Sequence, residues 1–142
     1  MGHQAGLDDV LDWLITNEGR LVNIDWLIEQ VDLFYPAQKG DHMLRPYRIG
    51  SHSLAARYFR LLDTSDYTNT VSKFDRTFRD ELVEAHLEAS RKRYAISEMA
   101  INVEIDGARV KGTYRRLLAP VKTKDGTPLI LLFSKLTQFT GR

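Results

Sequence analysis

The stretch that decides the fold is residues 97–140, where two Asp-Gly pairs divide three apolar or alternating segments. Residues 97–105 read SEMAINVEI, residues 108–122 read ARVKGTYRRLLAPVK and residues 127–138 read TPLILLFSKLTQ. An Asp-Gly pair between such segments is typical of a tight hairpin turn. The spacing therefore predicts three successive antiparallel strands.

The turn at Asp106-Gly107 also predicts the register of the first hairpin, because a two-residue loop pairs the residues on either side of it. One face then carries apolar pairs and the other carries two pairs of opposite charge, which favour this register by a few tenths of a kcal/mol each. A shift of one residue would lose both charge pairs and expose the apolar face. The predicted pairs are Ile105–Ala108, Val103–Val110, Ile101–Gly112 and Met99–Tyr114 on one face, and Glu104–Arg109, Asn102–Lys111 and Glu98–Arg115 on the other.

Length and composition indicate one globular domain. The chain has 142 residues, of which 43% are hydrophobic and 27% charged, as in ordinary folded proteins. No apolar run approaches the roughly 20 residues of a membrane helix, and the acidic N-terminus does not resemble a secretory signal. The chain has no cysteine, which excludes disulfides, thiolate metal sites and a cysteine nucleophile. We expect a cytoplasmic protein.

Charge is unevenly distributed. Residues 1–33 contain seven acidic residues and one basic residue, whereas residues 34–142 contain twelve acidic and nineteen basic residues. Opposite net charges predict that the two parts dock on each other, within or between chains. A nucleic-acid surface is the weaker interpretation, since no aromatic-basic RNA motif or helix-turn-helix pattern accompanies the charge.

Upstream of the strands, apolar periodicity predicts mostly helices. Apolar stripes over residues 7–17 and 24–31 predict two short helices that need another surface to cover them, with Trp13 and Trp26 near or off the stripes. Residues 33–50 suggest two short strands. A helix is expected over 54–62 with Leu54, Tyr58, Leu61 and Leu62 inward, a polar turn over 63–70, and a long helix over 73–93.

This layout resembles a PAS domain over about residues 42–139. The match rests on the order of elements and on Arg116, Pro120, Asp125-Gly126 and Leu136-Thr137 in the last two strands. The resemblance implies an α+β fold with an antiparallel sheet, flanking helices and an N-terminal helical cap. It also implies a cap over residues 1–40 that forms a homodimer, and a sensory domain over 41–142 that acts in bacterial-type signalling with a protein partner.

Arg116 is the most informative candidate for ligand binding. In the predicted register it follows Tyr114 on the apolar face, and an unpaired buried guanidinium is very costly. It would bind a carboxylate ligand with Tyr114 and Tyr58 nearby, pair with an acid on a helix, or be turned outward by a bulge. The residues predicted to line a ligand cavity are Arg116, Tyr114, Tyr58, Phe78, Leu82 and Leu118.

Cofactor and metal sites have little support in the sequence. Flavin or chromophore attachment through cysteine is excluded because the chain has none. Some PAS domains bind haem through a helix histidine, and His86 lies in the expected helix, but its position predicts a boundary imidazole and not a haem ligand. Asp41, His42 and His52 lack the spacing of a metal site.

We therefore expect a sensory or regulatory domain that binds a small molecule or mediates dimerisation, with no catalytic residues. One alternative is a small enzyme of the ketosteroid-isomerase type, which would need an inward Asp or His beside an inward Tyr; His86 with Tyr114 is the only pair that the sequence offers. Another is an oligomerisation module with a filled core and no ligand. Carboxylates such as Asp80 and Glu84 are spaced as on a solvated helix face.

Overall fold

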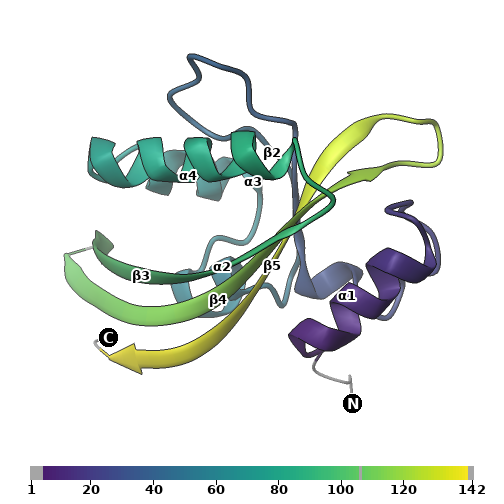
Figure 1. Ribbon diagram of the computed structural model, residues 1–142. Coiled ribbons are helices and arrows are strands. Elements are labelled where there is room, and N and C mark those ends of the chain that lie inside the picture. The colour runs from purple at the N-terminus through teal and green to yellow at the C-terminus, as the bar shows by residue number, and fades with distance from the viewer. Residues whose placement is uncertain (1–4, 106, 141–142) are drawn as a thin grey trace.

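A computed structural model describes residues 5–105 and 107–140, except for the side chains of residues 139 and 140. Five antiparallel strands form one sheet in the order β2-β1-β5-β4-β3, with helices on both of its faces (Figure 1). The predicted α+β class with an antiparallel sheet is confirmed. The elements are α1 (Leu7–Thr16), a 3-10 turn (Ile28–Gln30), β1 (Asp32–Phe34), β2 (Pro46–Ile49), α2 (Leu54–Phe59), α3 (Thr64–Val71), α4 (Arg76–Ala89), β3 (Ala95–Ile105), β4 (Ala108–Lys122) and β5 (Pro128–Thr140).

The three C-terminal strands form the predicted meander. All seven predicted pairs of the first hairpin are present, from Ile105 opposite Ala108 to Glu98 opposite Arg115. Gly107 has a φ of 80°, which a type I′ turn requires and glycine adopts without strain. Asp106 lies outside the described residues. The register prediction is confirmed.

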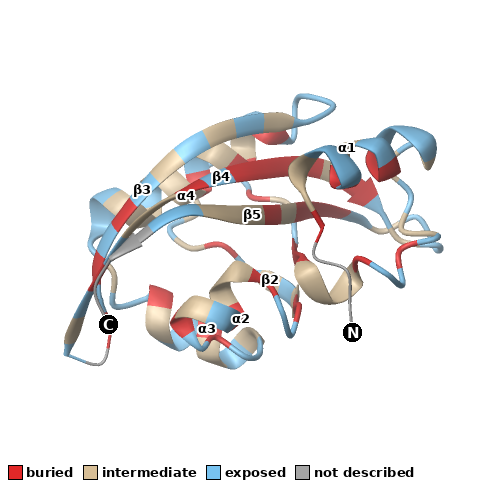
Figure 2. Cartoon of the chain, turned by 90° about the horizontal axis from the view of Figure 1, so that it is seen from below, coloured by how far each residue is buried: buried red, intermediate tan, exposed pale blue. Residues whose placement is uncertain are grey.

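The two faces of the sheet are covered by different parts of the chain. Alternate residues of β4 and β5 point to opposite faces, because side chains alternate along a strand. One set packs with residues from α2, α3 and α4, and the other packs with α1 and the segment after it. In Figure 2 the buried part of β4 continues beneath α1. The set beneath α1 comprises Leu117, Ala119, Val121, Leu129, Leu131 and Phe133.

The N-terminal segment docks on the sheet of its own chain. The helix predicted at 7–17 is present as α1, but residues 24–31 form turns and a 3-10 turn instead of a second α-helix. Ile24, Leu27 and Val31 of this segment are nevertheless buried, so contact with the sheet determines its conformation more than helix propensity does. Trp13 is also buried, and its indole Nε1 donates to the Val22 carbonyl over 2.9 Å. Strand β1 lies within the segment that was expected to form the cap.

The helices before the meander differ from the prediction in their bounds. Helix α2 ends before Arg60, which has a left-handed φ of 57°, so Leu62 is 63% exposed where an inward side chain was expected. The predicted polar turn at 63–70 is instead α3. The Asp63 carboxylate caps it by accepting from the Asp66 backbone N–H over 2.8 Å, and its Tyr67 is buried in the core. Helix α4 is shorter at both ends than residues 73–93.

Candidate functional site

A small cavity lies between helices α2–α4 and the sheet. Its volume is about 70 Å³. Most of its lining is aliphatic or aromatic, and it includes Phe78 and Leu82, both predicted ligand residues. The apolar lining is formed by Leu54, Ala55, Phe59, Leu61, Val71, Phe74, Phe78, Leu82, Ile101 and Leu132.

Three buried polar side chains also line this cavity, one each from β1, α3 and β4. Asp32, Tyr67 and Tyr114 are between 3% and 7% exposed. Burial raises the pKa of Asp32 from its usual 3.8 to about 7, although hydrogen bonds from Ser53 and Gly50 oppose the shift. Burial also raises the pKa of Tyr67, and the nearby charge of Asp32 adds to that shift. The cavity therefore has a polar end within an apolar shell.

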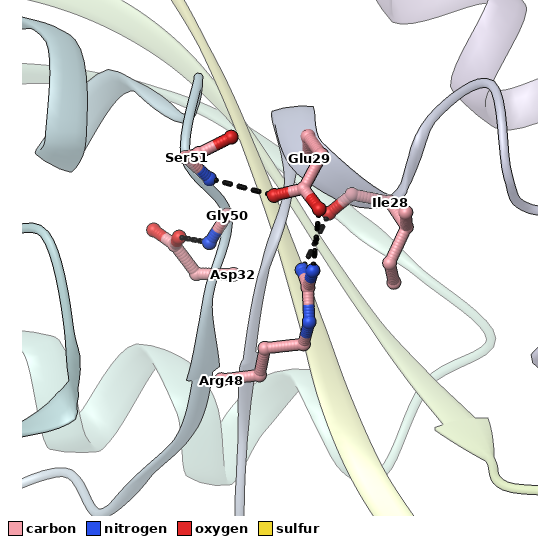
Figure 3. A network of polar contacts seen from close by, with 6 residues as sticks. All are labelled: Ile28, Glu29, Asp32, Arg48, Gly50 and Ser51. Carbon is pink, nitrogen blue, oxygen red and sulfur yellow. Dashed lines mark hydrogen bonds and ion pairs between the residues drawn. The ribbon is translucent and has the colours of Figure 1, made fainter.

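The turn after β2 holds Asp32 in place. The Gly50 backbone N–H donates to Asp32 Oδ1 over 3.0 Å, as Figure 3 shows. A Cβ at position 50 would lie 2.4 Å from the Val31 carbonyl oxygen and 2.6 Å from that of Glu29. Only glycine can therefore bring this N–H so close to the carboxylate.

A second group of contacts in Figure 3 ties the same turn to the segment before β1. Glu29 accepts from the Ser51 N–H over 3.0 Å and pairs with Arg48 at 2.7 Å. Arg48 also donates to the Ile28 carbonyl over 3.0 Å. The bonds from Ser51 and Arg48 lower the pKa of Glu29 from 4.5 to about 2. These contacts join the N-terminal segment to the wall of the cavity.

Arg116 points inward, as predicted, but lines a different space. It lies in a groove of about 640 Å³ between α4 and strands β3 and β4, together with Leu118. Its Nη2 is 3.5 Å from Glu81 Oε2 on α4, and its Nε donates to Ser97 Oγ over 3.3 Å. Of the three interpretations of Arg116, the structure shows pairing with a helix acid.

His86 is buried, so the prediction of a boundary imidazole was wrong. It is 1% exposed, and its ring contacts Phe34 edge to face with centroids 5.0 Å apart. Burial, together with the charge of Arg116, lowers its pKa from 6.5 to about 3. The ring is therefore neutral at physiological pH. The prediction for the His86 side chain failed because α4 turns Val83, His86 and Ala89 towards the core.

The predicted ligand residues thus fall into three places. Tyr114, Phe78 and Leu82 line the helix–sheet cavity, Arg116 and Leu118 line the α4 groove, and Tyr58 lines a third cavity of about 180 Å³ beside His52 and Lys135. Sequence reasoning missed Asp32 and Tyr67. An acid between apolar residues in the run Val31-Asp32-Leu33-Phe34 is the signal that could have identified Asp32.

Across the described ranges, 5–105 and 107–140, no three His, Asp or Glu side chains lie close enough together to hold a metal ion. In the same ranges no helix is both long and apolar enough to cross a membrane.

Three comparisons with known proteins found no match: no family model, no curated protein and no solved structure matches this chain.

Proposed function

We propose that this chain is a PAS-like sensory domain that binds a small molecule in the helix–sheet cavity. The observation that carries the proposal is the cluster of Asp32, Tyr67 and Tyr114 at the polar end of that cavity. Burying a carboxyl group without a buried cation costs free energy, and at Asp32 the hydrogen bonds from Gly50 and Ser53 oppose that cost without cancelling it. Buried titratable groups in an apolar pocket are typical of binding sites.

The order of elements supports the family part of the proposal. The resemblance to PAS domains rests on a short strand, a short helix, a long helix and then a three-stranded meander, and β2, α2, α4 and β3–β5 follow in that order. The lack of cysteine in the sequence supports the cytoplasmic setting proposed with it.

The cavity volume determines what kind of ligand we propose. About 70 Å³ is well below the roughly 300 Å³ of usual ligand pockets. A ligand of the usual size would therefore displace α2 and α3. Such a displacement would convert binding into a change of shape, as a sensor requires. The same volume leaves no room for a fused-ring substrate, which weighs against the isomerase-like alternative.

Native mass spectrometry of the purified protein tests this proposal, because it reports a retained ligand and the number of subunits together. Ala55 lines the cavity, and Ala55→Leu is expected to fill it and to abolish the ligand adduct. Ala100, exposed on β3, provides the matched control Ala100→Leu, which should keep the adduct. An adduct that survives in folded Ala55→Leu would refute the cavity as its site.

Dimerisation through the N-terminal segment is a second proposed function. The observation that favours it is two large apolar side chains that stay exposed on this segment after it docks, Ile15 at 44% and Trp26 at 46%. Exposed apolar groups of this size are common at protein interfaces.

A further inference from the structure

The α4 groove has features that the sensory proposal does not use. Its α4 side carries four acids, its β3–β4 side is largely apolar, and Arg116 lies at its floor. The acids are Asp80, Glu81, Glu84 and Glu88, and the apolar residues of the strand side are Ala95, Ile96, Met99 and Leu118. Its volume of about 640 Å³ is within the usual range for small-molecule sites.

Arg116 is incompletely paired at the floor of this groove. Its side chain is 5% exposed, and the ion pair with Glu81 is long at 3.5 Å. Among the described residues, Arg116 Nη1 and Glu81 Oε1 are both buried without a hydrogen-bond partner. Almost all buried polar groups in proteins have a partner. One unused donor therefore lies beside one unused acceptor.

The neighbours of Arg116 on the adjacent strands are small and polar. The register places Ser97 of β3 and Ser134 of β5 on either side of Arg116. Larger apolar neighbours at these two positions would favour a filled core. A buried ion pair is usually no more stabilising than apolar residues of the same volume, so stability does not account for Arg116.

The charges on the α4 side limit what the groove can bind. Asp80 is paired with Arg76 and Glu88 with Lys92, whereas no cation among the described residues pairs with Glu84. A simple anion would meet Arg116 but would be repelled by Glu81 and Glu84. A simple cation would meet these acids but leave Arg116 Nη1 unpaired. A ligand that carries both charges satisfies both sides.

We infer that this groove binds a free α-amino acid with an apolar side chain. Its carboxylate accepts from Arg116, its ammonium group donates to Glu81 and lies near Glu84, and its side chain contacts Ala95, Met99 and Leu118. Glu81 is 41% exposed, so its carboxylate can rotate towards the groove without disturbing the core. This site is separate from the helix–sheet cavity, and the inference does not rest on the proposed function.

Isothermal titration calorimetry with L-leucine and two analogues tests the inference. 4-Methylpentanoate keeps the carboxylate without the ammonium group, and 3-methylbutylamine keeps the amine without the carboxylate. Leucine is expected to bind at millimolar concentration or below, and each analogue to bind roughly tenfold to a hundredfold more weakly, since each loses a charge-assisted contact. No leucine binding, or equal binding of either analogue, would overturn the inference.

Variants then locate the site. Glu81→Gln should weaken leucine binding by roughly tenfold or more, whereas Glu104→Gln, at an exposed position of β3, should leave it unchanged. Arg116→Met should abolish binding; should it fail to fold, Ala95→Lys, at the partly buried groove wall, replaces it and should also abolish binding. Ala55→Leu should leave leucine binding unchanged, which separates this site from the helix–sheet cavity. Unaltered binding in folded Glu81→Gln would contradict the assignment.

Discussion

The backbone N–H of Gly50 donates to the buried carboxyl group of Asp32 over 3.0 Å, and this bond joins the turn after β2 to the polar end of the helix–sheet cavity. It is possible only because residue 50 has no Cβ. Asp32 thereby has a fixed donor on one oxygen, while burial disfavours its ionised form. The stability of the fold is therefore linked to the protonation of this group.

Asp32→Asn should change how stability depends on pH. Because the pKa of Asp32 is raised from 3.8 to about 7, the folded state holds a proton that the unfolded state loses between these values. Asp32 therefore makes the protein less stable as pH rises from about 4 to 7, by up to about 4 kcal/mol. Urea unfolding at several pH values should show that Asp32→Asn gains stability relative to the wild-type protein as pH rises from about 4 to 7. Asp12→Asn, at an exposed position of α1, should differ from the wild-type protein by the same amount at every pH; a pH-independent difference for Asp32→Asn as well would contradict the prediction.

His86 should change how stability depends on pH in the opposite direction to Asp32, and His86→Leu should remove this contribution. The pKa of His86 is lowered from 6.5 to about 3, so below pH 6.5 the unfolded state binds a proton that the folded state does not. His86 therefore makes the protein less stable as pH falls, which opposes the effect of Asp32 between about pH 4 and 6.5. The wild-type curve should be nearly flat in this window, and His86→Leu should become steadily less stable as pH rises. A flat curve for His86→Leu would show that the two groups do not offset each other.

Gly50→Ala should destabilise the protein by about 3 kcal/mol or more, as severe overpacking does. The added Cβ would lie under 3.0 Å from backbone carbonyl oxygens of Val31 and Glu29, and backbone cannot move aside as a flexible side chain can. Gly6→Ala is the control, because its Cβ would have only an ordinary contact at 3.6 Å. Thermal unfolding of both variants would measure the difference, and equal melting temperatures would show that the turn relaxes.

Ile15→Lys combined with Trp26→Asp should convert a dimer into a monomer if the N-terminal segment is the interface. Both side chains are exposed, so the double variant should keep its fold. Removing residues 1–33 instead would uncover apolar residues of β4 and β5, and loss of folding would then obscure the result. Analytical ultracentrifugation of both proteins would test this, with Leu62→Lys as an exposed control on the opposite side of the sheet. A double variant that remains a dimer would place the interface elsewhere.

The hairpin of β3 and β4 could be predicted in detail because its determinants are local. The turn at Asp106-Gly107 and the alternation of side chains fix which residues face each other, and the charge pair of Glu98 and Arg115 agrees with both. The same reasoning placed Arg116 on the inner face. The start of α2 was also predictable, since Ser53 caps it by accepting from the Ala56 N–H over 3.3 Å.

The candidate sites could not be predicted to the same degree. The helix stripe at 73–93 indicated that one face of α4 is buried, but a rotation of the helix by one residue decides whether His86 or its neighbours face the core. Residues 63–70 appeared to be a polar turn because few of them are apolar. Burial of Tyr67 on the sheet and the Asp63 cap make them a helix.

By itself, the sequence determined the α+β class, the register of the meander and the inward position of Arg116, because these follow from turns and periodicity within a few tens of residues. Only the tertiary structure decided that Asp32, Tyr67 and Tyr114 line one cavity and that Arg116 meets Glu81 in another space. Asp32, Tyr67 and Tyr114 lie 35 or more positions from one another in the chain. Glu81 and Arg116 are also 35 positions apart. Their meeting depends on how helices and strands pack, which no local pattern encodes.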